Sequence, residues 1–161
     1  MGIKVLKEPT IRLRYSEGFE GRMTWGLFKE GNIHGLFRDF FPITRSDEEN
    51  CDIVTIFLTT VPMSPWEMTQ EADGLGYECH AQVDSLLAVA ELTEIVEGNL
   101  IFSPKCVAGP LNLRVVPVID ARESPRKSRK LDLCFLHQPV VEGVLFIAQK
   151  KESHWSVKWH R

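Results

Sequence analysis

Hydrophobic and polar residues alternate near the start of the chain, a pattern typical of β-strands. Apolar and basic positions alternate from Ile11 to Tyr15, and a second alternating stretch runs from Met23 to Leu27. A period of two places one face of a strand against a core. The intervening segment, Ser16 to Gly21, contains two glycines suited to a turn, so the sequence predicts a hairpin here.

Two apolar stretches follow. The aromatic-rich segment Ile33 to Phe41 fits either a strand or a short helix. The run from Ile53 to Val61 is apolar or β-branched at nearly every position, which is typical of a strand covered on both faces. We therefore expect Ile53–Val61 to be a central strand that ends before Pro62.

A helix start with a clear physical basis comes next. Ser64 is suited to be the N-cap, Pro65 to occupy the first helical position, and Glu67 to complete a capping box. Because Gly74 and Gly76 follow closely, we expect this helix to be short.

A second helix is predicted from Asp84 to Glu97. Asp84 is available as its cap, Leu86, Leu87, Ala90 and Glu94 mark successive turns, and Gly98 offers a left-handed exit. It is the longest helix that the pattern supports.

From residue 100 onward the pattern returns to short strands. They are expected at Leu100–Phe102, Leu111–Ile119, Leu131–Leu136, Val144–Gln149 and Trp155–Trp159. Their short connections predict an antiparallel meander, with the prolines at strand starts, bulges or edges. The expected fold is thus α+β, a mostly antiparallel sheet with one or two helices inserted mid-chain, in a single domain over residues 1–161.

Composition and charge agree with one folded domain. Hydrophobic residues make up 43% and charged residues 25% of the chain, close to the average for globular proteins. The 22 acidic and 19 basic residues are spread evenly, so there is no global field to attract nucleic acid or a membrane. With no secretory signal and no apolar run long enough to span a bilayer, we expect the protein in the cytoplasm or nucleus.

No motif for catalysis or cofactor binding stands out. The four cysteines, Cys51, Cys79, Cys106 and Cys134, lack the spacing of a zinc or redox motif and are expected to be reduced and structural. Only His80 adjoins a cysteine, and the glycines of Gly74-Leu75-Gly76 do not complete a dinucleotide fingerprint. We expect no cofactor and no bound metal.

Two segments are candidate interaction sites. The stretch from Arg122 to Lys130 holds five basic side chains, Arg122, Arg126, Lys127, Arg129 and Lys130, at an expected hairpin tip where they could contact phosphates of RNA or anionic lipid; the alternative is a solvated loop. The C-terminal stretch interleaves Lys150 and Lys151 with Trp155 and Trp159. It suits base stacking or an interface anchor, or else a plain edge strand open to pairing.

The last third of the chain also carries a resemblance. Leu111–Asp120 with its charged loop, followed by Gly143–Trp155, resembles in order the closing elements of the matrix proteins of rhabdoviruses. That resemblance implies a non-enzymatic, self-associating protein that bridges a viral ribonucleoprotein and a membrane, found in the virion, with Lys127, Arg129 and Lys130 as contact residues.

Three functions follow from these observations. The first is a non-enzymatic structural or interaction protein that binds copies of itself, and in its matrix form also RNA and an anionic membrane, with no DNA-specific recognition evident. The second is a small-ligand domain with an apolar pocket under the 84–97 helix, lined by aromatic residues: Trp25, Phe28, Phe37, Phe57 and Trp66. The third is an enzyme with dispersed residues: His34, Asp52, Cys79 and His80.

Overall fold

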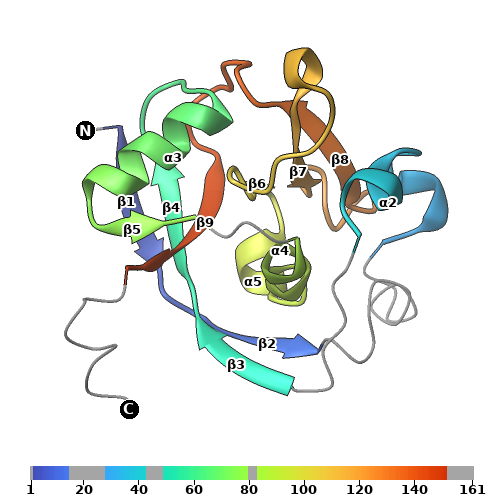
Figure 1. Cartoon of the computed structure of the whole chain (residues 1–161). Helices are drawn as coiled ribbons and strands as arrows, with labels where there is room; N and C mark the ends of the chain where they lie inside the picture. The colour runs from blue at the N-terminus through green and yellow to red at the C-terminus, as the bar shows by residue number, and fades with distance from the viewer. Residues whose placement is uncertain (1, 15–27, 43–48, 80–82, 152–161) are drawn as a thin grey trace.

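A computed structural model describes residues 2–14, 28–42, 49–79 and 83–151 (Figure 1). The strands are β1 (Ile3–Lys7), β2 (Thr10–Arg14), β3 (Glu49–Ile53), β4 (Thr55–Thr59), β5 (Tyr77–Glu78), β6 (Leu100–Phe102), β7 (Val115–Asp120), β8 (Lys130–Phe135) and β9 (Leu145–Lys150). The helices are α2 (Phe37–Phe40), α3 (Pro65–Gly74), α4 (Asp84–Val89) and α5 (Thr93–Val96), with 3-10 turns η1 (Glu30–Asn32) and η2 (Leu111–Leu113). This is the predicted α+β fold.

The main sheet has the strand order β1-β4-β9-β6-β7-β8, and β5 pairs with the end of β9. Strands β6, β7 and β8 form the predicted antiparallel meander. The prediction was wrong for β9, which returns between β4 and β6 and runs parallel to β6. Four consecutive residues of β9, Leu145 to Ala148, are buried. A strand that is apolar on both faces belongs in the middle of a sheet rather than at its edge.

The predicted central strand is β4, which lies between β1 and β9. Its successive residues Ile56 and Phe57 are fully buried in two different hydrophobic clusters, one on each face of the sheet. The predicted run 53–61 is interrupted at Val54, whose amide donates to the carbonyl of Pro9. Residues before the interruption belong to β3, which pairs with β2 in a separate two-stranded ribbon.

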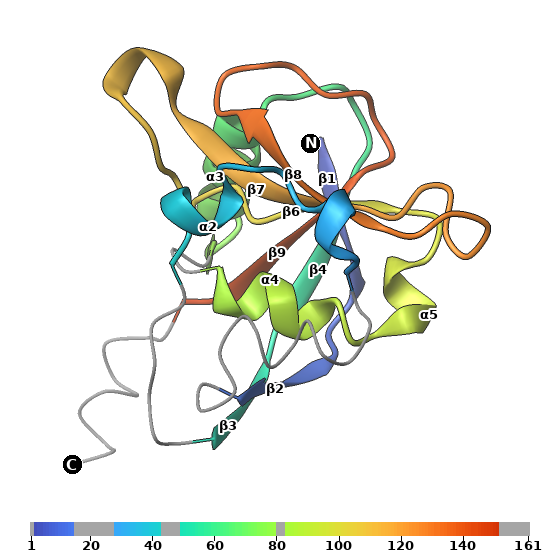
Figure 2. The same ribbon diagram turned by 90° about the vertical axis from the view of Figure 1, so that its right-hand side faces the viewer.

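The expected helix 84–97 is two short helices. The chain turns tightly after α4, where the amides of Glu91 and Leu92 donate to carbonyls three residues back, and α5 starts at Thr93. Val83, not Asp84, is the N-cap residue of α4. Every residue of α4 is buried because the helix lies between the main sheet and the β2–β3 ribbon, as Figure 2 shows. A helix that is buried on all sides needs no single apolar face, whereas the prediction from the sequence assumed one.

Two smaller differences concern the start of β7. The predicted strand 111–119 begins as the turn η2, and extended structure starts only at Val115. Pro117 lies inside β7 rather than at a strand start or edge. Strand β6 ends at Phe102, which pairs with Val118. The pairing of β6 with β7 therefore stops one residue short of Pro117, which has no amide hydrogen to donate.

The predicted short helix that starts at Ser64 is confirmed. Ser64 caps α3, with the amide of Glu67 donating to the Ser64 hydroxyl and the amide of Ser64 donating to the Glu67 carboxylate. The segment 33–41 fits either a strand or a short helix from its sequence, and in the structure its residues Phe37–Phe40 form the short helix α2. The predicted hairpin partner at 23–27 and the C-terminal strand at 155–159 lie outside the described residues, and the strand predicted at 11–15 appears as β2.

Candidate functional site: a groove beside helix α3

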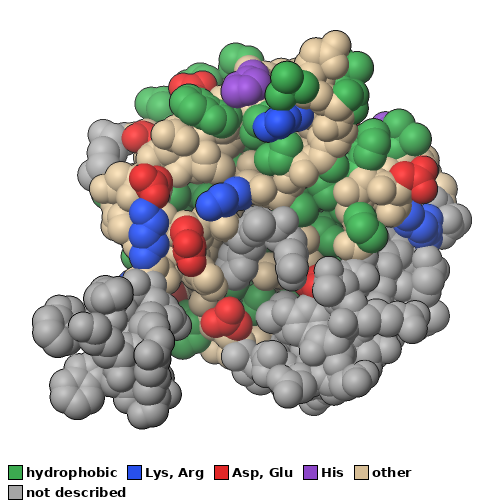
Figure 3. Space-filling view, in the orientation of Figure 1, with side chains coloured by type: hydrophobic (Ala, Val, Ile, Leu, Met, Phe, Trp, Pro, Cys, Tyr) green, Lys and Arg blue, Asp and Glu red, His purple; other side chains and the backbone are tan. Residues whose placement is uncertain are grey.

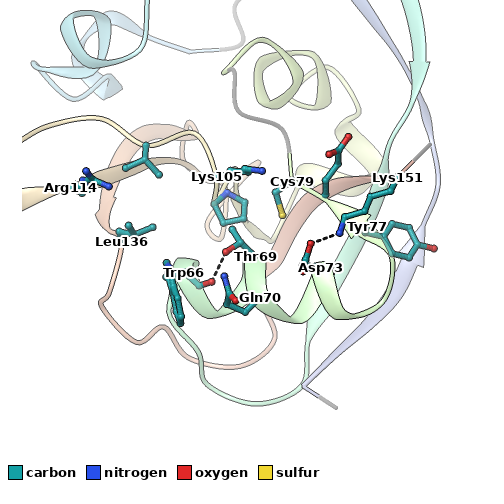
Figure 4. A pocket seen from close by; sticks show the side chains of 13 residues that line it. Trp66, Thr69, Gln70, Asp73, Tyr77, Cys79, Lys105, Arg114, Leu136 and Lys151 are labelled. Carbon is teal, nitrogen blue, oxygen red and sulfur yellow. Dashed lines mark hydrogen bonds and ion pairs between the residues drawn. The ribbon is translucent and has the colours of Figure 1, made fainter. Parts of the chain in front are cut away.

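A groove of about 350 Å³ runs along helix α3 (Figure 4). Helix α3 supplies one wall, and the segment from Pro104 to Val107, which follows β6, supplies part of the other. Arg114 and Leu136 lie toward one end, and Tyr77 and Lys151 toward the other. The lining residues come from six separate stretches of the chain.

Backbone hydrogen bonds hold the Trp66 end of the groove together. The amide of Trp66 donates to the carbonyl of Leu136 (3.0 Å), and the amide of Leu136 donates to the carbonyl of Arg114 (3.0 Å). These two hydrogen bonds join the start of α3, the residue after β8 and the residue before β7, which are far apart in the sequence. At the opposite end, the amide of Lys151 donates to the carbonyl of Gly76 (3.0 Å) and anchors the end of β9 beside β5.

Aromatic and apolar side chains are exposed along this groove. Trp66 is 45% exposed and Val107 is 39% exposed. The ring of His137 lies 5.9 Å from that of Trp66, centroid to centroid. Figure 3 shows hydrophobic side chains gathered over the upper part of this face, with basic side chains among them. The groove therefore offers both apolar contact and positive charge.

Charge is distributed unevenly within the groove. Lys151 forms an ion pair with Asp73, and this hydrogen bond and charge hold the pKa of Asp73 below its ordinary value. Glu78 accepts a hydrogen bond from the side-chain amide of Gln149 (3.4 Å). Lys105 and Arg114, in contrast, are exposed and form no salt bridge within the described ranges.

Cys79 also lines the groove, but it is not suited to nucleophilic chemistry. Its side chain is 6% exposed, and burial raises the pKa of the thiol to about 12, although the charge of Lys105 opposes this shift. A thiol with that pKa is protonated at neutral pH, and the thiolate is the reactive form.

The residues proposed for an enzyme are not brought together. Cys79 lines the groove, Asp52 lines a hollow beside Glu8 and Lys150, and His34 lines another beside Leu131. His80 lies outside the described residues. Proton transfer needs direct or water-bridged reach, and these separate hollows do not provide it between the described members of the set.

The aromatic residues proposed for a ligand pocket are also divided. Phe28 and Phe37 are buried in the cluster around α4, and Phe57 is buried in the cluster on the other face of the sheet. Trp66 is at the surface, and Trp25 lies outside the described residues. The described members of this set are therefore not gathered around one space beneath α4, all of whose residues are buried.

The basic loop is a hairpin tip between β7 and β8, as predicted, but its charges are largely engaged. Arg122 binds Asp120 through two side-chain hydrogen bonds of 3.0 and 2.8 Å, which lower the pKa of Asp120. Lys127 lies 3.6 Å from the Glu123 carboxylate. Arg129 folds back and donates to the carbonyl of Ala90 at the end of α4. Arg126 and Lys130 form no salt bridge in the part of the chain that is described.

The other predicted interaction residues lie elsewhere. Lys150 is at the end of β9, Lys151 is in the groove, and Trp155 and Trp159 are outside the described residues. Sequence reasoning missed Lys105, Arg114 and Gln70 altogether. Their place on the groove depends on the fold, and no local sequence pattern marks it.

Comparisons with known proteins identify no relative: no protein-family model, no curated protein and no solved structure matches the chain. The resemblance to rhabdovirus matrix proteins therefore stays a prediction. Within residues 2–14, 28–42, 49–79 and 83–151, no three metal-ligating side chains gather as a candidate site. Nor does any helix in those ranges have the length and apolar character needed to cross a bilayer.

Proposed function

We propose that this chain is a non-enzymatic interaction protein that binds a segment of a partner protein in the groove beside α3. The observation that carries the proposal is the exposure of Trp66 and Val107 on this groove, with Arg114 at its end. Tryptophan and arginine are the residues most enriched among those that dominate binding energy at protein interfaces. A half-exposed tryptophan on the wall of a groove suits contact with apolar side chains of a partner.

The turn η2, which directly precedes the groove residue Arg114, carries two more exposed apolar side chains. Leu111 is 80% exposed and Leu113 is 53% exposed, immediately before Arg114. Single exposed leucines are ordinary, but several large apolar side chains beside a groove mark an interaction surface. The fold thus presents apolar contact area around a polar, cationic opening.

Both edges of the main sheet have features that disfavour pairing with another strand, and this favours the groove as the binding surface. At the β8 edge, the amide of His34 donates to the carbonyl of Leu131 (2.8 Å) and the amide of Leu133 donates to the Asp132 carboxylate (2.8 Å). At the β1 edge, Lys4 and Lys7 are both exposed. Local hydrogen bonds and lysines are both devices that discourage pairing with another strand.

The test is a selection of peptides from a displayed library. The wild-type protein should enrich a common sequence, and Trp66→Ala should lose that enrichment while keeping the urea midpoint of a folded domain. Leu75→Ala is the matched control, because Leu75 is an exposed apolar residue at the other end of α3 that does not line the groove. Equal enrichment by wild type and Trp66→Ala would contradict the proposal.

Self-association, expected from the sequence, is a particular form of this function in which the partner is a second copy. Light scattering after size exclusion, over a range of protein and salt concentrations, tests it. A mass that rises with concentration in the wild type and not in Trp66→Ala would identify the second copy as the partner. A matrix-like role would further require binding to RNA or anionic liposomes in the same experiment.

A further inference from the structure

The two halves of the groove differ in the state of their charges. Toward β5, the carboxylates of Asp73 and Glu78 already have partners in Lys151 and Gln149. Toward Trp66, the cation of Arg114 has no carboxylate partner among the described residues. Lys105 lies near Cys79, between the two ends, and forms no salt bridge in the described ranges, although its charge also helps to lower the pKa of Asp73. The apolar side chains of Trp66 and Val107 line the same groove.

We infer that the occupant of the groove is an acidic peptide segment, one that carries carboxylates beside large apolar side chains; the inference rests on the proposed function and names its ligand class. Carboxylates suit the fork of Arg114 and the ammonium of Lys105, and an apolar side chain between them suits Trp66 and Val107. A segment that fits the groove must match both its positive charge and its apolar surface.

Gln70 gives the groove a means to bind peptide backbone. Its side-chain amide is exposed on the groove wall and makes no hydrogen bond within the described part of the chain, whereas the neighbouring Thr69 hydroxyl already donates to the carbonyl of Trp66 (2.6 Å). A free primary amide both donates and accepts, so it can pair with a peptide unit. Figure 4 shows Gln70 next to Trp66 along the same wall.

A nucleic acid is a poorer fit to the same groove. Its phosphates could pair with Lys105 and Arg114 as the carboxylates of a peptide could, so charge alone does not separate the two ligands. The exposed leucines of η2 would gain nothing from a polyanionic backbone. In the basic loop between β7 and β8, three of the five basic side chains are already engaged within the protein.

The experiment measures binding of fluorescein-labelled short peptides by fluorescence anisotropy. The probes are a peptide in which glutamate alternates with leucine, the same peptide with glutamine for glutamate, one with serine for leucine, and a single-stranded RNA of matched length. The inference predicts saturable binding of the glutamate–leucine peptide that weakens with salt, and about tenfold weaker binding of the glutamine and serine versions.

Two charge reversals locate the site. Arg114→Glu should weaken the glutamate–leucine peptide about tenfold, while Arg126→Glu, the same change in the basic loop, should leave it unaltered. Lys105→Glu gives a second reversal should Arg114→Glu fail to fold.

Three outcomes would overturn the inference: preference for RNA, equal binding of the glutamine peptide, or sensitivity to Arg126→Glu alone. If neutral apolar peptides bind in a Trp66-dependent way, the inference fails and the proposed function survives; if no displayed or synthetic peptide binds, both fail.

Discussion

The thiols of Cys79, Cys106 and Cys134 lie free in the structure. Burial raises the pKa of Cys79 and Cys106 to about 12 and that of Cys134 to about 11, from an ordinary value of 9.0. The sequence indicated reduced, structural cysteines, because no pair had a metal or redox spacing. For these three residues the prediction agrees with the structure, since each thiol is unbridged.

These pKa values predict slow alkylation of the native protein. In the folded state the rate of iodoacetamide modification at Cys79 and Cys106 should stay low through pH 9 and rise only toward pH 12, because the thiolate is the nucleophile. In concentrated urea the rate should already rise through pH 9. Mass spectrometry of digested peptides assigns each site. Rapid modification of native Cys79 at pH 8 would contradict a buried, protonated thiol at this position.

Local chemistry made some residues predictable and left others hidden. The capping role of Ser64 depends on a residue three positions away, so the sequence was sufficient to predict it. The roles of Lys105 and Arg114 depend on their meeting Trp66 across a groove, and nothing near them in sequence marks that meeting. Residues whose function depends on distant segments require the fold.

At the scale of elements, helix α3 depends on its capping box. Ser64→Ala removes the acceptor for the Glu67 amide and should lower the free energy of unfolding by about 1 kcal/mol. Urea denaturation measures the change. Ser64→Asp keeps an acceptor and should lose much less, so equal loss in both variants would point to the buried environment of Ser64 rather than to the cap.

The position of the turn η2 depends on a glycine. Gly109 has φ +92°, and a Cβ there would lie 2.8 Å from the carbonyl oxygen of Leu113 in η2. Gly109→Ala should therefore cost at least about 1–2 kcal/mol and displace η2. Gly74→Ala is the control, since the end of α3 has open space at that position and alanine favours a helix. A neutral Gly109→Ala in urea denaturation would contradict this account of η2.

Element boundaries show where pattern alone was insufficient. The capped helix and the strand at β4 were predictable because each has a strong local signal. The segment 84–97 was read as one helix because its apolar residues recur at helical spacing, but burial on all sides lets the chain turn after Ala90. Tertiary packing decided the boundary, as it often does.

For the whole molecule, the order of strands in the main sheet could not be predicted from the sequence. Short connections predicted a meander through β9, yet β9 crosses to pair with β4 and β6. Only the two-sided burial of Leu145–Ala148 indicates a central place, and the sequence does not specify which strands flank it.

The exposed lysines of β1 bear on assembly of the whole molecule. Lys4 and Lys7 lie on an edge strand with exposed Val5 and Leu6. Replacing both lysines with threonine should promote concentration-dependent association, because edge lysines oppose strand pairing. Light scattering should show a higher mass for this variant than for wild type. Arg126→Thr combined with Lys130→Thr removes the same charge elsewhere and should not associate; if it does, net charge rather than the β1 edge controls assembly.

The most direct test of the central claim, that the groove beside α3 binds a partner protein, is NMR chemical-shift mapping with the glutamate–leucine peptide or a peptide selected by display. The account predicts that the largest changes fall on the Trp66 indole, the Gln70 side-chain amide and the backbone of 104–107 and 114. Amides of the 122–130 loop and of α4 should remain unchanged. Changes confined to the 122–130 loop, or none on the groove at saturation, would contradict the claim.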